Sequence, residues 1–188
     1  SIEAYADITR QAVEKISLSR IFVVGHSLGG AVGLVACAGL DNLAHFVSVE
    51  GNLVAQDCGL VSRSLAAQPV EEFRTSGFAE FLHGLRDSAR RDLRVWAEWF
   101  ASGDPTAIHQ AAGSLVGWSD SGKLMEIFAG LPQKSYIYGD QDDRLGYLLP
   151  TLRCIPQRAI LGADHFPMVD EPAAFYRALA ELCGETGF

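Results

Sequence analysis

The chain has 188 residues, 48% of them hydrophobic, and a formal net charge of −8. This length and apolar content suit one domain with a sizeable core, and the acidic balance argues against nucleic acid or an anionic membrane as a partner. No apolar run is long enough to cross a bilayer. The cysteines show no metal-ligand spacing, so we expect no metal or other cofactor and a reducing, cytoplasmic location.

Short apolar strands alternate with helical segments along the chain. The predicted strands are 21–24, 43–50, 135–138 and 158–161. The predicted helices cover 5–16, 28–39, most of 69–131, and a last segment from Pro172 to just before Gly184. This order predicts an α/β fold with a mostly parallel sheet and helices on both faces. In such sheets, functional residues gather at the carboxyl ends of the strands.

The strand at 21–24 leads into Gly25-His26-Ser27-Leu28-Gly29-Gly30, which opens an apolar helix. A G-x-S-x-G turn between a strand and a helix raises its serine above the sheet as a nucleophile. We expect Gly25 and Gly29 to avoid clashes across the tight bend. The alternative is a tight turn in which Ser27 only caps the following helix.

A serine nucleophile needs a base, and His165 is the predicted one. It lies in the loop Gly162-Ala163-Asp164-His165-Phe166-Pro167, directly after the last strand. The alternative for His165 is a structural hydrogen bond in that loop. The other histidines fit less well, since they lie next to the serine, within a strand or within the helical block: His26, His45, His83 and His109.

The histidine in turn needs a carboxylate to orient its ring. Asp142 is the predicted acid, because it follows the strand at 135–138. Asp140 and Asp143 are alternatives in the same turn, although Asp143 could instead pair with Arg144 or cap the next helix. Glu50 is a separate alternative that ends the strand at 43–50. We expect the true partner to accept a hydrogen bond from the His165 ring.

These motifs resemble the α/β-hydrolase superfamily over almost the whole chain. Gly25 to Gly30 is similar to the family's G-H-S-x-G-G elbow, Gly139-x-x-Asp142 to its acid turn, and Gly162-x-x-His165-Phe166-Pro167 to its histidine loop. The resemblance implies a helical cap at 69–131, inserted after the second strand of this chain into a core of 1–68 and 132–188. Relatives with the acid after strand six imply Glu50 instead of Asp142.

One departure from the family concerns the start of the fold. Four strands with crossovers precede the nucleophile strand in the family and need about 80 residues, whereas 26 residues precede Ser27. We therefore expect the first strands, and one oxyanion-hole donor, to lie upstream of Ser1. The backbone N–H of Leu28 is the oxyanion donor predicted within this chain.

The helical block is rich in aromatic residues, which admit two interpretations. They could pack on one another and on the sheet, or they could line an apolar acyl or aryl pocket above Ser27. The candidates for that pocket are Phe78, Phe81, Trp96, Trp99 and Phe100.

The sequence thus predicts a serine hydrolase that cleaves an ester or similar acyl bond of a small, largely apolar substrate. Ser27 would attack, His165 would move the proton, and Asp142 would orient His165. The alternatives are a ligand-binding receptor or scaffold with little turnover, or a carbon–carbon hydrolase, haloperoxidase or lyase that uses the same triad.

Overall fold

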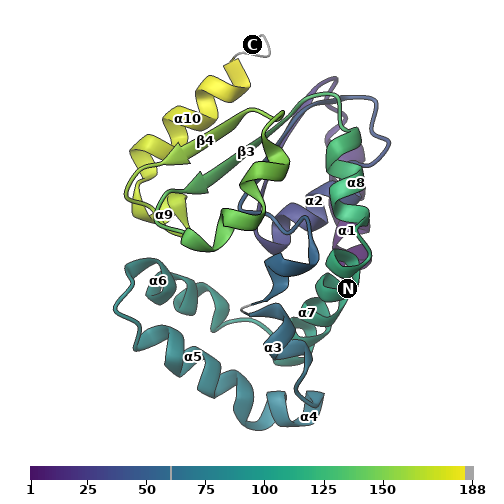
Figure 1. Ribbon diagram of the computed structural model, residues 1–188. Helices are drawn as coiled ribbons and strands as arrows, with labels where there is room; N and C mark the ends of the chain where they lie inside the picture. Colours follow the sequence, from purple (N-terminus) through teal and green to yellow (C-terminus); the bar gives the residue numbers. More distant parts are fainter. Residues whose placement is uncertain (60, 185–188) are drawn as a thin grey trace.

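A computed structural model describes residues 1–59 and 61–184 of the chain. Its sheet contains four strands that follow the chain order, each parallel to its neighbour (Figure 1). The strands are β1 (Ile21–His26), β2 (Leu43–Val49), β3 (Lys134–Gly139) and β4 (Gln157–Ile160). The predicted α/β class with a parallel sheet is therefore confirmed.

Helices cover both faces of this sheet and fill the long connection between β2 and β3. They are α1 (Ile2–Ile16), α2 (Leu28–Cys37), α3 (Ser62–Ala66), α4 (Val70–Glu72), α5 (Phe78–Arg86), α6 (Arg91–Phe100), α7 (Pro105–Asp120), α8 (Lys123–Gly130), α9 (Pro167–Asp170) and α10 (Pro172–Gly184). None of the helices in the described part of the chain is long and apolar enough to cross a membrane.

The two faces of the sheet are buried in separate apolar clusters. On one face, Phe46 of β2 packs in the same cluster as Leu34 of α2 and Phe128 of α8. On the other face, Val47 of β2 packs in a cluster with Phe175 of α10. Neighbouring residues of β2 thus point to opposite faces, as the two-residue period of a strand requires.

The helices between β2 and β3 form a layer beside the ends of the strands. Leu65, Phe73 and Ala112 make a small core of their own there, and Figure 1 shows α4, α5 and α6 standing away from the sheet. The last helix of the connection, α8, behaves differently. Its Leu124 and Phe128 pack into the main cluster on the sheet.

Candidate active site

Ser27 occupies a strained turn between β1 and α2. Its φ of 50° and ψ of −126° lie outside the regions that non-glycine residues prefer. Its side chain makes no capping hydrogen bond to α2, so the alternative that Ser27 only caps the helix is not supported. Its backbone N–H donates to the Val49 carbonyl at 3.1 Å, which brings Ser27 next to the residue that follows β2.

The tightness of this turn depends on Gly25 and Gly30. A Cβ atom on Gly25 would lie 2.7 Å from the Gly30 Cα, and one on Gly30 would lie 2.9 Å from the Gly51 Cα. A Cβ on Gly29 would meet nothing within 4 Å. The expectation for Gly25 is therefore confirmed and that for Gly29 is wrong, because Gly29 faces open space while Gly30 packs on the neighbouring backbone.

Leu28, the predicted oxyanion donor, is the first residue of α2. The N–H groups of the first helical turn have no carbonyl partner within the helix, and they point toward any negative charge beside Ser27. The role of the Leu28 N–H stays a prediction.

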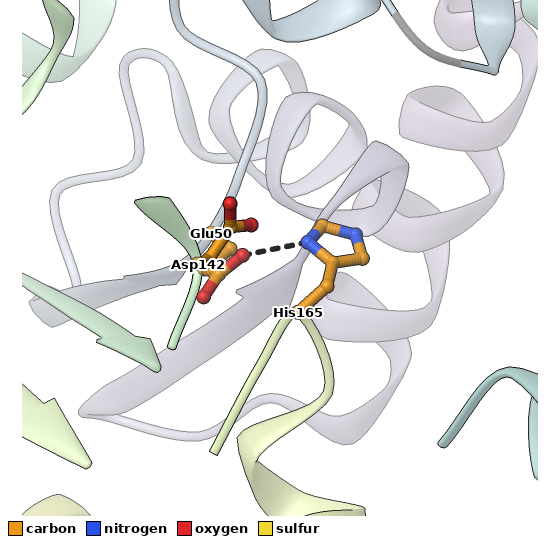
Figure 2. A group of neighbouring side chains, drawn as sticks. All are labelled: Glu50, Asp142 and His165. Atoms are coloured by element: carbon orange, nitrogen blue, oxygen red, sulfur yellow. Dashed lines mark hydrogen bonds and ion pairs between the residues drawn. The ribbon is translucent and has the colours of Figure 1, made fainter. Parts of the chain in front are cut away.

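His165 forms its closest side-chain contact with Glu50. Its Nδ1 lies 2.6 Å from Glu50 Oε2 (Figure 2). The other oxygen, Oε1, accepts a hydrogen bond of 2.8 Å from the Gly139 N–H. Glu50 has a φ of 44°, so backbone strain occurs at both Ser27 and Glu50, as is common at functional sites. Both Glu50 oxygens are held in place, and one of them is directed at the His165 ring.

The prediction that Asp142 accepts the hydrogen bond of His165 is wrong in this structure. Asp142 is buried, but Arg144 donates to both of its carboxylate oxygens, through Nε to Oδ1 at 2.6 Å and through Nη2 to Oδ2. Asp142 also accepts from the Arg144 backbone N–H at 3.1 Å. The pairing with Arg144 and the capping, which were the alternative for Asp143, belong to Asp142, and Arg144 engages both of its oxygens.

The other two candidate acids are also directed elsewhere. Asp140 accepts a hydrogen bond of 2.7 Å from the Gly162 N–H, so it joins the ends of β3 and β4. Asp143 is exposed at the start of a short 3₁₀ turn, Asp143–Tyr147. Of the four candidate carboxylates, Glu50 is the one that contacts the His165 ring.

His26, which we set aside as a base, contacts the His165 loop. Its Nε2–H donates to the His165 carbonyl at 2.8 Å, and its ring lies 4.9 Å from the His165 ring and 4.7 Å from the Phe166 ring. Burial, with a further contribution from the His165 charge, lowers the pKa of His26 to about 3. A neutral His26 therefore supports the loop that carries His165.

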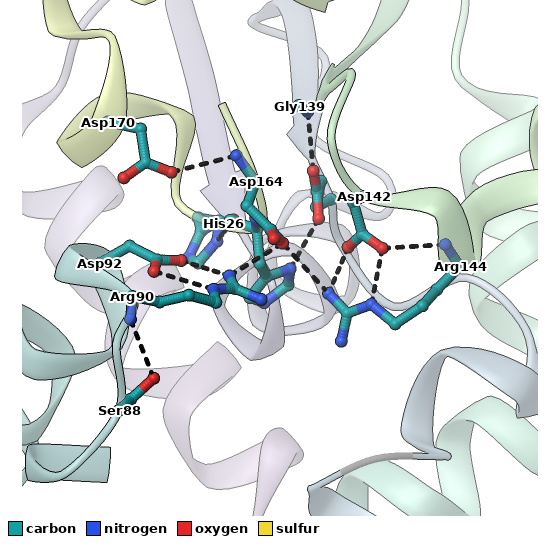
Figure 3. A network of polar contacts seen from close by, with 11 residues as sticks. His26, Ser88, Arg90, Asp92, Gly139, Asp142, Arg144, Asp164 and Asp170 are labelled. Atoms are coloured by element: carbon teal, nitrogen blue, oxygen red, sulfur yellow. Dashed lines mark hydrogen bonds and ion pairs between the residues drawn. The ribbon is translucent and has the colours of Figure 1, made fainter. Parts of the chain in front are cut away.

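Two arginines and three aspartates interact at this loop (Figure 3). We call them the arginine–carboxylate network, which consists of Arg90, Asp92, Asp142, Arg144 and the loop's own Asp164. Arg90, just before α6, pairs with Asp92 at 2.5 Å and with Asp164 at 2.8 Å. Arg144 lies 3.8 Å from the same Asp164 oxygen. Because Asp164 directly precedes His165, the network links α6 and the β3 turn to the histidine loop.

Burial moves the pKa values of Glu50 and His165 in opposite directions. It raises the pKa of Glu50 to about 9, with a further contribution from the Asp142 charge. It lowers the pKa of His165 to about 4, with a further contribution from the Arg144 charge. Each buried group is more stable uncharged. A neutral His165 ring can accept a proton, as a general base must.

The side chains of Glu50, Asp142 and His165 can offer ligand atoms that lie within 4.8 Å of one another. This donor set could in principle hold a divalent cation. However, the guanidinium of Arg144 already takes both oxygens of Asp142, and His165 Nδ1 is engaged with Glu50. A metal ion would have to displace both contacts.

The aromatic side chains predicted for a pocket pack mainly on one another. Phe81 lies 5.5 Å from Trp96 and 5.6 Å from Phe100, and Phe78 lies 6.0 Å from Phe100, between ring centroids. Trp99 is 57% exposed. Trp96 also contacts the histidine loop, at 5.5 Å from Phe166.

The comparison with known families agrees with this fold. The chain belongs to the alpha/beta hydrolase family, whose model matches residues 1–178. The class is that of hydrolytic enzymes, so the expected family and enzyme class are confirmed. No curated protein matches the chain.

Several solved structures share the fold at low sequence identity. A thermophilic esterase from Thermogutta terrifontis has a TM-score of 0.76 and 18% identity, with 100% of this chain and 74% of that chain covered. A structure from a study of carboxylesterases of Nitrososphaera gargenis has a TM-score of 0.73 and 18% identity, covering 99% and 72%. E-2-(Acetamidomethylene)succinate hydrolase has a TM-score of 0.69 and 20% identity, covering 98% and 74%.

Proposed function

We propose that the protein is a serine hydrolase that cleaves an ester or similar acyl bond of a small, largely apolar substrate. The observation that carries the proposal is the 2.6 Å contact between His165 Nδ1 and Glu50 Oε2, at the sheet edge where Ser27 stands on its strained turn. A buried carboxylate on Nδ1 leaves Nε2 as the nitrogen that takes a proton. The triad is thus Ser27, His165 and Glu50.

In this proposal Ser27 Oγ attacks the substrate carbonyl while His165 Nε2 takes its proton. Glu50 stabilises the imidazolium that forms, and the Leu28 N–H donates to the developing oxyanion. His165 then gives the proton to the leaving alcohol, and water releases the acyl group by the same steps. Among the described residues, Ser27 Oγ makes no hydrogen bond to the His165 ring. Such bonds often tighten only when substrate binds.

The proposed core is 1–68 and 132–188, and the proposed cap is 69–131, with α8 resting on the core. The apolar character of the substrate is supported by Phe166, whose ring lies 5.0 Å from His165 and 5.5 Å from Trp96. The rings of Trp96 and Phe166 thus bring apolar side chains of the proposed cap and of the histidine loop together. Residues Phe78, Phe81 and Phe100 would stabilise Trp96 from behind.

A fluorophosphonate probe and p-nitrophenyl butyrate test the proposal. The purified protein should become labelled at Ser27 and should hydrolyse the ester. Ser27→Ala should lose labelling and lower kcat by about 10⁶, because nucleophile and base act as a unit. Ser102→Ala, which changes an exposed serine in the cap, is the matched control and should behave as the unchanged protein. Equal labelling of the Ser27→Ala variant would remove Ser27 as the nucleophile.

A further inference from the structure

Two buried carboxylates lie near the His165 ring, and one of them contacts it. Glu50 Oε2 contacts Nδ1 at 2.6 Å, and Asp142 has an oxygen within 4.8 Å of a His165 nitrogen and of a Glu50 oxygen. The Asp142 side chain is only 2% exposed. Asp142 is thus a second buried carboxylate beside the one that contacts the ring.

The two carboxylates differ in what neutralises them. Arg144 donates to both oxygens of Asp142, and its backbone N–H donates as well. Paired, planar contacts of this kind fix both the charge and the orientation of a carboxylate. Glu50 has the Gly139 N–H on Oε1 and the His165 ring on Oε2, and among the described residues no arginine donates to it.

From this difference we propose that Arg144 is a positioning residue that determines which carboxylate orients His165. By neutralising Asp142 and holding it away from the ring, Arg144 leaves Glu50 as the partner and makes Asp142 a latent second one. This inference rests on the proposed function for its kinetic meaning. The hydrogen bond itself can be followed without turnover.

The test removes Glu50 and then releases Asp142. Glu50→Gly suits the backbone, because glycine adopts the φ of 44° without strain. This single variant should lower kcat on p-nitrophenyl butyrate by about 10³–10⁴. Adding Arg144→Gln should recover about 10-fold or more of that loss, and adding Asp142→Asn as a third change should remove the recovered activity. Glu50→Gly with Arg144→Lys keeps a cation at the position and should recover less.

The ¹⁵N NMR signals of histidine-labelled protein report which His165 nitrogen carries the proton, with His165→Gln for assignment. Above about pH 9, where Glu50 is ionised, the Nδ1–H form should dominate in the unchanged protein, decline in Glu50→Gly, return in the double variant and decline again in the triple variant. Circular dichroism checks that each variant is folded, and Glu50→Gln replaces Glu50→Gly in the series if the glycine variants unfold.

Two results would overturn the inference. One is a folded double variant that is no more active than Glu50→Gly and shows no return of the Nδ1–H form. The other is a triple variant that keeps the recovered activity. If the unchanged protein neither turns over ester nor labels at Ser27, the proposed function fails, and the NMR series still decides the role of Arg144.

Discussion

At the scale of single residues, the charge state of the Glu50–His165 pair controls whether a base is available. Burial raises the pKa of Glu50 to about 9 and lowers that of His165 to about 4. Between these two pH values the Glu50 carboxyl is protonated and the His165 ring is neutral. The nearby carboxylates Asp142 and Asp164 oppose a further negative charge. The reactive form, with an ionised Glu50 and a neutral ring, is therefore favoured as pH rises.

The pH dependence of hydrolysis follows from the ionisation of Glu50 as the pH rises. We expect kcat/KM to increase with pH, with its midpoint above the ordinary histidine pKa of about 6.5 and no higher than about 9. Arg144→Gln should move the midpoint upward, because the Arg144 charge lowers the pKa of both Glu50 and His165. A pH–rate profile in a neutral ester substrate measures this, and a profile that falls from pH 6 to 9 contradicts it.

Conservative changes of the two acids distinguish their roles. Glu50→Gln removes the charge beside His165 and should lower kcat by about 10³–10⁴, since the imidazolium loses its partner. Asp142→Asn should lower kcat by less than about 10-fold, because Arg144 already neutralises that carboxylate. Steady-state kinetics on one ester compare them directly. A larger loss for Asp142→Asn than for Glu50→Gln would return Asp142 to the triad.

At the scale of elements, the β1–α2 turn packs against its neighbours through backbone atoms of glycine residues. Gly25 lies against Gly30, and Gly30 lies against Gly51 after β2, so the turn, the helix start and the end of β2 are packed without intervening side chains. The positions of Ser27 and Glu50 relative to each other depend on this packing.

Matched glycine variants test the turn. Gly25→Ala would put a Cβ 2.7–2.8 Å from backbone atoms of Gly29 and Gly30, which cannot move without displacing α2. We expect it to lower the free energy of unfolding by about 2–3 kcal/mol and to abolish labelling of Ser27. Gly29→Ala, which meets open space, should change the stability by less than about 1 kcal/mol. Urea unfolding measures both, and equal stabilities would contradict the packing argument.

At the scale of the whole molecule, the helical layer is joined to the histidine loop through the start of α6. Arg90 pairs with Asp164, Arg91 donates to the Val169 carbonyl, and Trp96 lies beside Phe166. Arg91 and Val169, 78 residues apart in sequence, are thus connected close to His165. Movement of α6 on substrate binding would therefore reach the histidine loop.

Arg90→Ala tests this connection. It leaves the buried Asp92 without its cation, which should lower the free energy of unfolding by about 2 kcal/mol, less than for a fully buried pair because Arg90 is 36% exposed. It should also reduce kcat by about 10-fold through Asp164. The control is Arg86→Ala, which removes an exposed pair with Glu98 in the same layer and should change stability by less than about 1 kcal/mol. Identical behaviour of the two variants would argue against the connection.

Much of the fold was accessible from local patterns. The apolar strand, the glycine-rich turn and the small-residue helix around Ser27 depend on residues close in sequence, so the sequence predicted them. The position of His165 after the last strand followed from parallel topology, because all carboxyl ends meet at one edge. The sequence signal for Glu50 was a charged residue at the end of an apolar strand. This signal could not rank Glu50 above the three aspartates of the β3 turn as the partner of His165.

What the sequence by itself determined is therefore the family, the parallel sheet and the placement of Ser27 and His165 at one edge. Only the tertiary structure decided that Glu50 contacts His165, that Arg144 holds Asp142, and that Gly30 instead of Gly29 lies at the close contact. The reason is physical: a hydrogen-bond partner is chosen by small differences in distance between side chains that come from separate elements. Periodicity and spacing along the chain do not encode distances of that size.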